Sequence, residues 1–214
     1  MGCNASKAIW CKNCQSRAIR IKPPYCKRCG YPSERAICKW CRYKTPWFDG
    51  VRSWARYGGE LRTALLLLKA QRDTSLAAAL AEHLEELFSV SWAIDLIVPI
   101  PLSAARLRLR GFNQAELLAA AFTNLVQLPT AINALVRVRD TQFQKILTRA
   151  EREQNLFRAF RADKKSFAGM KILMVDDIFV TGATINSASK AIKKAGGQAV
   201  FAITVARSLM NTPA

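Results

Sequence analysis

Residues 172–184 read Ile-Leu-Met-Val-Asp-Asp-Ile-Phe-Val-Thr-Gly-Ala-Thr, and this stretch is the strongest signal for the fold. Its apolar run predicts a buried strand, which leads into two adjacent carboxylates, Asp176 and Asp177. A loop of small and hydroxylated residues follows and opens a helix: Thr181, Gly182, Ala183 and Thr184. Small side chains let a phosphate approach the backbone, and the free N–H groups at a helix start favour an anion. The pattern predicts a phosphate site with both carboxylates facing sugar hydroxyls, although a bare Asp-Asp pair would also suit a turn at Asp177.

The sequence around this unit alternates strands and helices. We expect strands at 95–100, 135–138, 171–175 and 199–205, helices at 113–128 and 184–195, and a short helix near 148–155. Upstream, leucines at steps of three or four residues predict one or two helices over 60–88, with a possible break near 72–74. Strands separated by helices imply a parallel sheet covered on both faces. The expected fold class is therefore α/β.

Positive charge is concentrated at the start of the chain. The 214 residues hold 33 Lys+Arg and 15 Asp+Glu, a net charge of +18. Residues 1–56 hold 13 basic and 2 acidic side chains and have no sustained hydrophobic period. We therefore expect a basic cysteine-rich module over 1–50 and an α/β domain over 51–214. A field of this sign attracts polyanions such as nucleic acid.

Composition also excludes several classes of protein. Half of the chain is hydrophobic, which excludes a disordered or collagen-like chain. The longest uncharged run, 117–136, contains two asparagines, a glutamine and a proline, so we expect no membrane span. Because the N-terminus has no apolar signal-peptide core, a reducing cytoplasm is the expected location of the seven cysteines.

Six of these cysteines form three CxxC pairs. The pairs are Cys11/Cys14, Cys26/Cys29 and Cys38/Cys41, and Cys3 stands alone. A two-residue gap lets both thiolates of a pair point at one metal, and two pairs complete a tetrahedral site. The short spacing between the last two pairs predicts a compact zinc ribbon held by Cys26, Cys29, Cys38 and Cys41. A redox role for one pair is a weaker alternative, since no βαβ pattern surrounds any of them.

The strand–Asp-Asp–Thr-Gly pattern resembles the ribose-phosphate loop of type I phosphoribosyltransferases. Further motifs resemble the ComF family, which combines a cysteine module with a phosphoribosyltransferase-like domain and is associated with DNA uptake in natural competence. These motifs are Val98-Pro-Ile-Pro-Leu102, Arg106, Arg110-Gly-Phe-Asn-Gln114, Thr148-Arg-Ala-Glu-Arg-Glu-Gln-Asn155 and Phe160. They run in the family's order along the whole chain.

The resemblance implies roles for particular residues. Asp176 and Asp177 would contact ribose hydroxyls of phosphoribosyl pyrophosphate, and residues 181–184 would hold its 5-phosphate. Arg106 and Arg110 would meet the diphosphate, although Arg110 could instead order the turn that follows it. Mg²⁺ would bridge the diphosphate and the ribose. Val180 stands where many relatives have Thr, which removes one hydroxyl.

The resemblance leaves the first cysteines unallocated. Longer relatives have four pairs and thus two zinc sites, whereas here Cys3 looks like half of a first pair. Either a site of Cys3, Cys11 and Cys14 is incomplete, or the annotated start is late, or Cys11/Cys14 pairs with Cys26/Cys29.

Aromatic rings alternate with Lys and Arg through the first 56 residues. Stacking rings among cations suit unstacked bases, so we expect single-stranded DNA as a partner, although some rings must form the module's core. Trp47 is expected to be more exposed than Trp40, which lies inside a cysteine pair. His83, in the helical region, is expected to face solvent or pack against a helix rather than act as a base. Competence-machinery proteins are a further possible class of partner.

Two functions follow from the sequence. The first is a ComF-like protein that binds phosphoribosyl pyrophosphate and single-stranded DNA. The second is a phosphoribosyltransferase for a small nitrogenous acceptor with a purely structural zinc module. In the segment 139–161, a flexible lid and a solvated helix both remain open.

Overall fold

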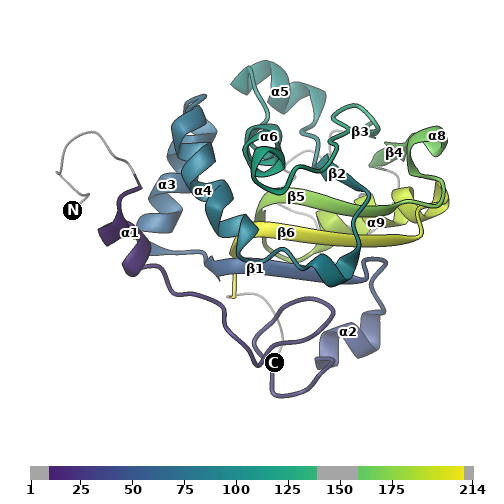
Figure 1. The fold of residues 1–214 in the computed structure, drawn as a ribbon, viewed down its shortest axis with the longest axis horizontal. Helices are drawn as coiled ribbons and strands as arrows, with labels where there is room; N and C mark the ends of the chain where they lie inside the picture. The colour runs from purple at the N-terminus through teal and green to yellow at the C-terminus, as the bar shows by residue number, and fades with distance from the viewer. Residues whose placement is uncertain (1–9, 139–158, 210–214) are drawn as a thin grey trace, which may run out of the picture.

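The computed structural model describes residues 10–138 and 159–209 and contains a four-stranded parallel sheet (Figure 1). The strand order is β1-β6-β5-β2. The strands are β1 (Gly50–Arg56), β2 (Leu96–Pro99), β5 (Lys171–Phe179) and β6 (Ala199–Arg207). The α/β class and three of the predicted strands are confirmed, whereas β1 was not predicted. Because β5 runs to Phe179, both aspartates lie within the strand and not in the loop after it.

Helices cover both faces of the sheet. The longer helices are α3 (Gly59–Ala70), α4 (Thr74–Glu85), α6 (Gln114–Val126) and α9 (Ala183–Lys194). The first three lie on one face in Figure 1, and α9 lies on the other. The predicted break between two helices is confirmed: the Asp73 side chain accepts from the backbone N–H groups of Ser75 and Leu76 and so caps α4.

Alternation along β5 creates two cores. Leu173 and Val175 pack with α3, α4 and α6, whereas Ile172 and Met174 pack with α9. Successive side chains of a strand point to opposite faces, so an apolar strand in a covered sheet supplies both cores. The same alternation directs Asp176 and Asp177 to different faces.

Shorter elements complete the described chain. They are α1 (Lys12–Ser16), α2 (Lys39–Lys44), a 3₁₀ turn η1 (Val90–Trp92), α5 (Ala104–Arg110), α8 (Lys164–Phe167), β3 (Leu135–Arg137) and β4 (Phe160–Ala162). The strand expected at 135–138 is confirmed as β3, but it pairs antiparallel with β4 in a separate two-stranded sheet. The helix expected near 148–155 and most of the expected lid lie outside the described residues.

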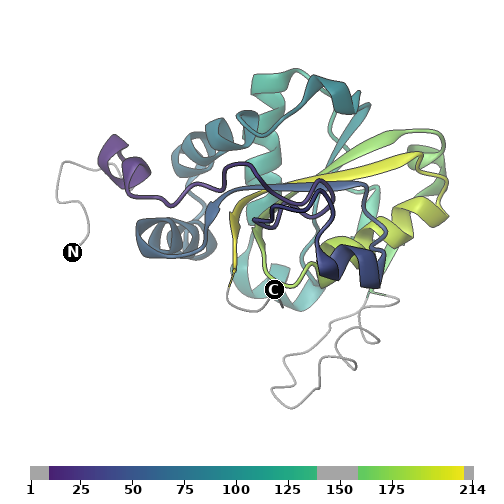
Figure 2. The same ribbon diagram turned by 90° about the horizontal axis from the view of Figure 1, so that it is seen from below.

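The N-terminal segment runs along the outer edge of β1. Ile21 N donates to Trp54 O at 2.9 Å, Arg56 N donates to Ile19 O at 2.8 Å, and Val51 N donates to Arg28 O at 2.7 Å. An uncovered edge strand would expose unpaired backbone groups. In Figure 2 this segment and α2 lie across the sheet in front of α9. In the part of the chain that the structure describes, no helix is both long and apolar enough to span a bilayer.

Candidate functional site

The carboxylate pair lies at the C-terminal end of β5, where ligands bind in open α/β sheets. Asp177 is buried and Asp176 is partly buried. The backbone N–H of Asp177 donates to Oδ1 of Asp176 at 2.8 Å. Burial, followed by the neighbouring charge of Asp177, raises the pKa of Asp176 well above its usual value. A nearby cation or cationic ligand would therefore favour the ionised pair.

Lys69 supplies one such cation, and no motif in the sequence indicated it. It lies in the last turn of α3, and its Nζ forms an ion pair with Oδ2 of Asp177. Asp177 is two and four residues beyond Val175 and Leu173 on β5, so its side chain points to the same face of the sheet as theirs. That is the face that α3 covers. A lysine at the end of a leucine-rich helix has no sequence signal for this role, because the contact depends on the packing of α3 on the sheet.

A cavity of about 650 Å³ opens in front of the carboxylates. Charged groups of both signs line it: Lys69, Arg106, Arg110, Arg137, Asp176 and Asp177. Leu102, Leu109 and Val180 are among its apolar residues, and Thr184 also lines it. The structure thus brings Arg106 and Arg110 to the same cavity as the aspartates, from a position about seventy residues earlier in the chain. Gln114, the last residue of the Arg110–Gln114 motif, also lines the cavity, as does Arg137, which no sequence motif indicated.

The two arginines lie on α5, a short helix that follows β2. The Ser103 side chain accepts from the Arg106 N–H and caps this helix, and Gly111 ends it in the left-handed conformation with φ of 78°. Arg110 also donates to the side chain of Gln114 across the turn. It therefore both lines the cavity and orders the turn, so the two alternatives for Arg110 are not exclusive. Burial lowers the pKa of Arg110, and the charge of Asp177 opposes this shift.

Next to the main cavity, the loop after β5 forms a hollow of about 70 Å³. Its lining includes the four predicted residues Thr181, Gly182, Ala183 and Thr184, with Asp176 and Ile178. Gly182 adopts a φ of +78°, and a Cβ there would lie 2.5 Å from the Phe179 ring, so glycine is required at this position. Thr181 Oγ1 accepts from Ala183 N at 3.3 Å as α9 begins. A phosphate-sized hollow at the start of a twelve-residue helix suits an anion.

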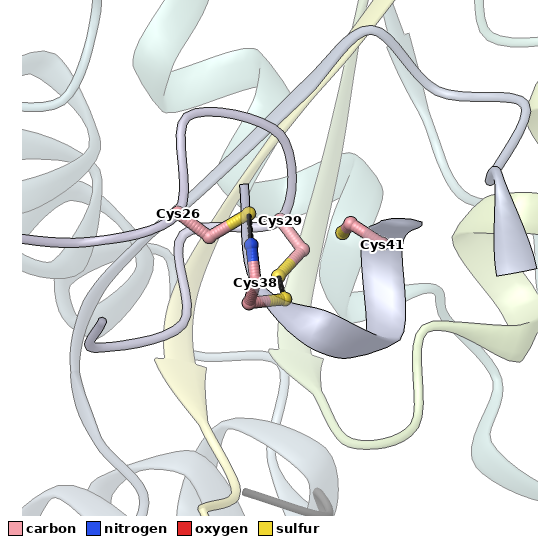
Figure 3. A group of neighbouring side chains, drawn as sticks. All are labelled: Cys26, Cys29, Cys38 and Cys41. Carbon is pink, nitrogen blue, oxygen red and sulfur yellow. Dashed lines mark hydrogen bonds between the residues drawn. The ribbon is translucent and has the colours of Figure 1, made fainter. Parts of the chain in front are cut away.

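The second candidate centre is a cluster of four buried cysteines (Figure 3). The ligand atoms of Cys26, Cys29, Cys38 and Cys41 all lie within 4.8 Å of one another. Cys26 and Cys29 project from one loop, whereas α2 begins directly after Cys38 and contains Cys41. Cys29 Sγ lies 3.7 Å from Cys38 Sγ, and the N–H of Cys38 donates to Cys26 Sγ at 3.4 Å.

These distances fit a zinc ion. With Zn–S bonds of about 2.3 Å, tetrahedral geometry places sulfurs about 3.8 Å apart. A hydrogen bond from Cys41, and to a lesser degree the charge of Arg207, lower the pKa of Cys29 to about 5, although burial opposes the shift. Burial raises the pKa of Cys38 to about 11. A metal ion would stabilise all four thiolates.

Cys11 and Cys14 lie outside the four-cysteine cluster. Their sulfurs are 3.7 Å apart at α1, and Cys14 packs in the core cluster that contains Trp10 and Trp54. The alternative in which Cys11/Cys14 pairs with Cys26/Cys29 is therefore wrong, since the latter pair faces Cys38 and Cys41. Cys3 lies outside the described residues.

Some of the N-terminal rings form the core, as the sequence analysis expected. Trp10, Phe48 and Trp54 are buried in the core. Tyr43 and Trp47 are 82% and 44% exposed. Trp40 is partly buried and stacks on Phe48, so the expected difference between Trp47 and Trp40 is present.

His83 is buried against the rings of Trp10 and Trp54, so the expectation that it faces solvent is wrong. Its ring stacks on Trp54 with centroids 3.8 Å apart. Trp10 Nε1–H donates to His83 Nε2 at 3.0 Å, so the proton of the neutral ring lies on Nδ1, 3.2 Å from Glu86 Oε1. The cavity at Asp176 and Asp177 does not include His83.

Comparison with known proteins gives the family. Residues 73–212 match the family model described as the phosphoribosyl transferase domain. The chain is 31% identical to DNA utilization protein YhgH of Escherichia coli (strain K12), with 93% of this chain and 90% of that protein covered. It is 29% identical to competence protein F of Haemophilus influenzae, with 92% and 90% covered. Among solved structures, glutamine phosphoribosylpyrophosphate amidotransferase of B. subtilis matches with a TM-score of 0.41 and 20% identity. That match covers 64% of this chain and only 26% of the amidotransferase. As the motifs indicated, the chain belongs to the ComF/YhgH competence family, whose members contain a phosphoribosyl transferase domain.

Proposed function

We propose that the cavity binds phosphoribosyl pyrophosphate. The observation that supports this best is the meeting of two carboxylates, several cations and a phosphate-sized hollow in one place. Asp176 and Asp177 would accept hydrogen bonds from the ribose hydroxyls, and residues 181–184 would hold the 5-phosphate. Arg106 and Arg110 would bind the diphosphate, because guanidinium groups pair well with phosphate oxygens. The match to the phosphoribosyl transferase domain supports the same ligand.

The donor set also fits Mg²⁺. Carboxylate oxygens are the ligands that Mg²⁺ prefers, and the ion is commonly held by one or two carboxylates together with substrate phosphates. Asp176 and Asp177 would hold it, directly or through water, and when bound it would neutralise the departing diphosphate. Before the ligand arrives, Lys69 balances the charge of Asp177.

Transfer would break the bond between the anomeric carbon and the diphosphate and form a bond from that carbon to a nitrogenous acceptor. Arg106 and Arg110 would stabilise the negative charge that develops on the leaving diphosphate. Asp176 and Asp177 would stabilise the positive charge on the ribose. We propose this enzymatic activity with the acceptor unassigned.

Calorimetry with phosphoribosyl pyrophosphate and Mg²⁺ tests the site. The double substitution Asp176→Asn and Asp177→Asn removes charged acceptors worth roughly 1.5–3 kcal/mol each, about tenfold or more in affinity per residue. The matched control is Glu82→Gln with Glu85→Gln, which removes two exposed carboxylates from α4. Binding that is equal in the two double variants would place the ligand elsewhere.

We also propose that the four cysteines hold one Zn²⁺, as their spacing allows. The purified protein should contain one zinc per chain. A chain that folds with its thiols free and without metal would contradict this.

Single-stranded DNA is the second proposed ligand, and two exposed rings favour it. Lys44 Nζ lies 5.7 Å from the centroid of the Tyr43 ring, and Lys190 Nζ lies 5.2 Å from the centroid of the Trp47 ring. Rings beside cations can stack on bases while the ammonium groups meet phosphates. The names of two relatives, a competence protein and a DNA utilization protein, support a role in DNA uptake, with competence-machinery proteins as partners.

Tyr43→Ala and Trp47→Ala test this surface. Each should weaken oligonucleotide binding by roughly 1–3 kcal/mol and leave zinc content unchanged. Leu66→Ala, which removes another exposed apolar side chain from α3, is the control. If the ring variants bind as tightly as the wild type, the alternative function gains support: a phosphoribosyltransferase for a small nitrogenous acceptor with a structural zinc module.

A further inference from the structure

A buried cation connects the four-cysteine centre to the loop after β5 and the first residues of α9, 180–184, which we call the phosphate loop after its proposed ligand. Arg207, the last residue of β6, is only 1% exposed. Its Nη1 donates to the backbone oxygen of Cys29 at 2.5 Å, and its Nη2 lies 3.9 Å from Cys29 Sγ. A buried guanidinium needs such acceptors, since an uncompensated charge in the interior is costly. The position of Arg207 therefore depends on the position of Cys29.

The other side of the same guanidinium lies over Phe179. The Cζ atom of Arg207 is 4.2 Å from the centroid of this ring, which also meets Phe48 edge to face at 6.3 Å. The ring in turn lies against Gly182, because a Cβ at Gly182 would come within 2.5 Å of Phe179 Cζ. Phe179 thus stands directly between Arg207 and the backbone of the phosphate loop.

Three further hydrogen bonds hold the residues that flank this loop. Ser208 N, next to Arg207, donates to Phe179 O at 2.9 Å. Trp47 N, just beyond α2, donates to the side chain of Asn186 at 2.7 Å. The backbone N–H of Asn186 donates to Gly182 O at 2.8 Å in the first turn of α9. Through Phe48 and Trp47, the segment after the cysteines therefore contacts Phe179 and Asn186, which flank residues 181–184.

We propose that Arg207 is a positioning residue through which the four-cysteine centre controls the conformation of the phosphate loop. Loss of the cluster would displace the Cys29 carbonyl and remove the acceptor of Arg207. The guanidinium would then leave the Phe179 ring, and the loop at Gly182 would lose its packing partner. The consequence for ligand affinity rests on the proposed phosphoribosyl function, whereas the coupling itself does not.

Amide hydrogen exchange without ligand tests the coupling directly. The reporters are the N–H groups of Asn186 and Ser208, which bond to Gly182 O and Phe179 O. Arg207→Lys keeps the charge but loses the planar group over the ring, and it should raise exchange at both amides by about tenfold while zinc stays bound. The control is Arg56→Lys, because Arg56 is exposed and is the register partner of Arg207 on β1. Removing zinc from the wild type with a chelator should raise exchange at the same two amides.

Phe179→Leu is the second variant if Arg207→Lys does not fold. It leaves both bonds to Cys29 available and removes the ring, so it should also retain zinc and raise exchange at Asn186. Unchanged protection at both amides in the variant that folds, or after zinc removal, would overturn the proposal. The wild-type protein is titrated with ribose 5-phosphate in parallel. If zinc removal raises exchange but ribose 5-phosphate does not bind, the coupling stands and only the proposed function is contradicted.

Discussion

Two stretches of the N-terminal region contain CxxC pairs and are held in different ways. Around Cys11 and Cys14, the chain is anchored by apolar packing, because Trp10, Cys14 and Trp54 share a core with α3 and α4. Around Cys26–Cys29 and Cys38–Cys41, two pairs face each other and the thiols themselves form the interior. The same motif thus marks a packed helix start in one place and a closed four-cysteine centre in the other. What distinguishes them in the described residues is whether a second pair lies opposite.

Cys29→Ser tests whether the four-cysteine stretch depends on its metal, and it should have the largest effect. It should release zinc and unfold the segment between residues 25 and 48, because metal binding of roughly 10–16 kcal/mol is linked to folding in such modules. Zinc release measured with a colorimetric chelator, together with limited proteolysis, checks this.

Cys14→Ser is the matched control for that variant. Cys14 lies in the packed stretch and outside the four-cysteine centre, so one zinc per chain should remain. Equal zinc loss in both variants would mean that the two stretches are not independent.

Trp10→Ala should do the reverse of Cys29→Ser: it should destabilise the packed stretch without releasing zinc. It removes a buried ring that meets Trp54 edge to face at 6.1 Å, and it leaves His83 without its donor. Such a truncation typically costs about 3–5 kcal/mol, while zinc content should not change. Urea denaturation measures the free energy of unfolding, and zinc loss in this variant would argue against the distinction.

A smaller effect is expected at Gly30, where the four-cysteine segment meets β1. Gly30 has a φ of +71°, and a Cβ there would lie 2.6 Å from Val51 O. Gly30→Ala should therefore destabilise the protein by about 1–3 kcal/mol through backbone strain. Gly58→Ala is the control, since a Cβ at Gly58 would meet nothing within 4 Å. Thermal melting of the two variants provides the comparison.

The smallest effect concerns the pH dependence of the packed stretch. Burial lowers the pKa of His83, although Glu86 and Glu82 oppose the shift and Arg20 adds to it. The unfolded chain therefore binds a proton below about pH 6.5 before the folded protein does, and stability falls as the pH decreases from there. The loss should be at most about 1.4 kcal/mol per pH unit.

His83→Gln keeps an acceptor for Trp10 and removes the titration. Urea midpoints of the wild type and this variant between pH 5 and 8 should converge at low pH if His83 is responsible. A constant difference across the range would exclude this titration as the cause. Because both proteins hold the same cysteine cluster, metal release at low pH cancels in the comparison.

Local patterns predicted much of the fold correctly. The apolar run before Asp176 and Asp177 indicated β5, and the small residues after it indicated the loop that forms the phosphate-sized hollow. Asp73 marked the break between α3 and α4 because capping is local. The spacing of Cys26, Cys29, Cys38 and Cys41 indicated the cluster, since two pairs of this kind fit one tetrahedral centre.

Contacts between distant elements could not be predicted in this way. β1 is an edge strand whose pairing with β6 spans most of the chain, and its sequence lacks a clear alternation. Lys69 meets Asp177 only because α3 packs on the face to which Asp177 points. Likewise, composition did not separate buried rings such as Trp54 from exposed ones such as Tyr43.

By itself, the sequence determined the α/β class, the strand–Asp-Asp–Thr-Gly pattern and the pairing of cysteines that can share a metal. All three depend on residues close together in the chain, where periodicity and ligand spacing are physical constraints. Only the tertiary structure decided that Arg207 lies between Cys29 and Phe179, and that Lys69 faces the carboxylates. A buried charge is tolerated only where packing supplies its partners, and those partners come from segments far apart in the sequence.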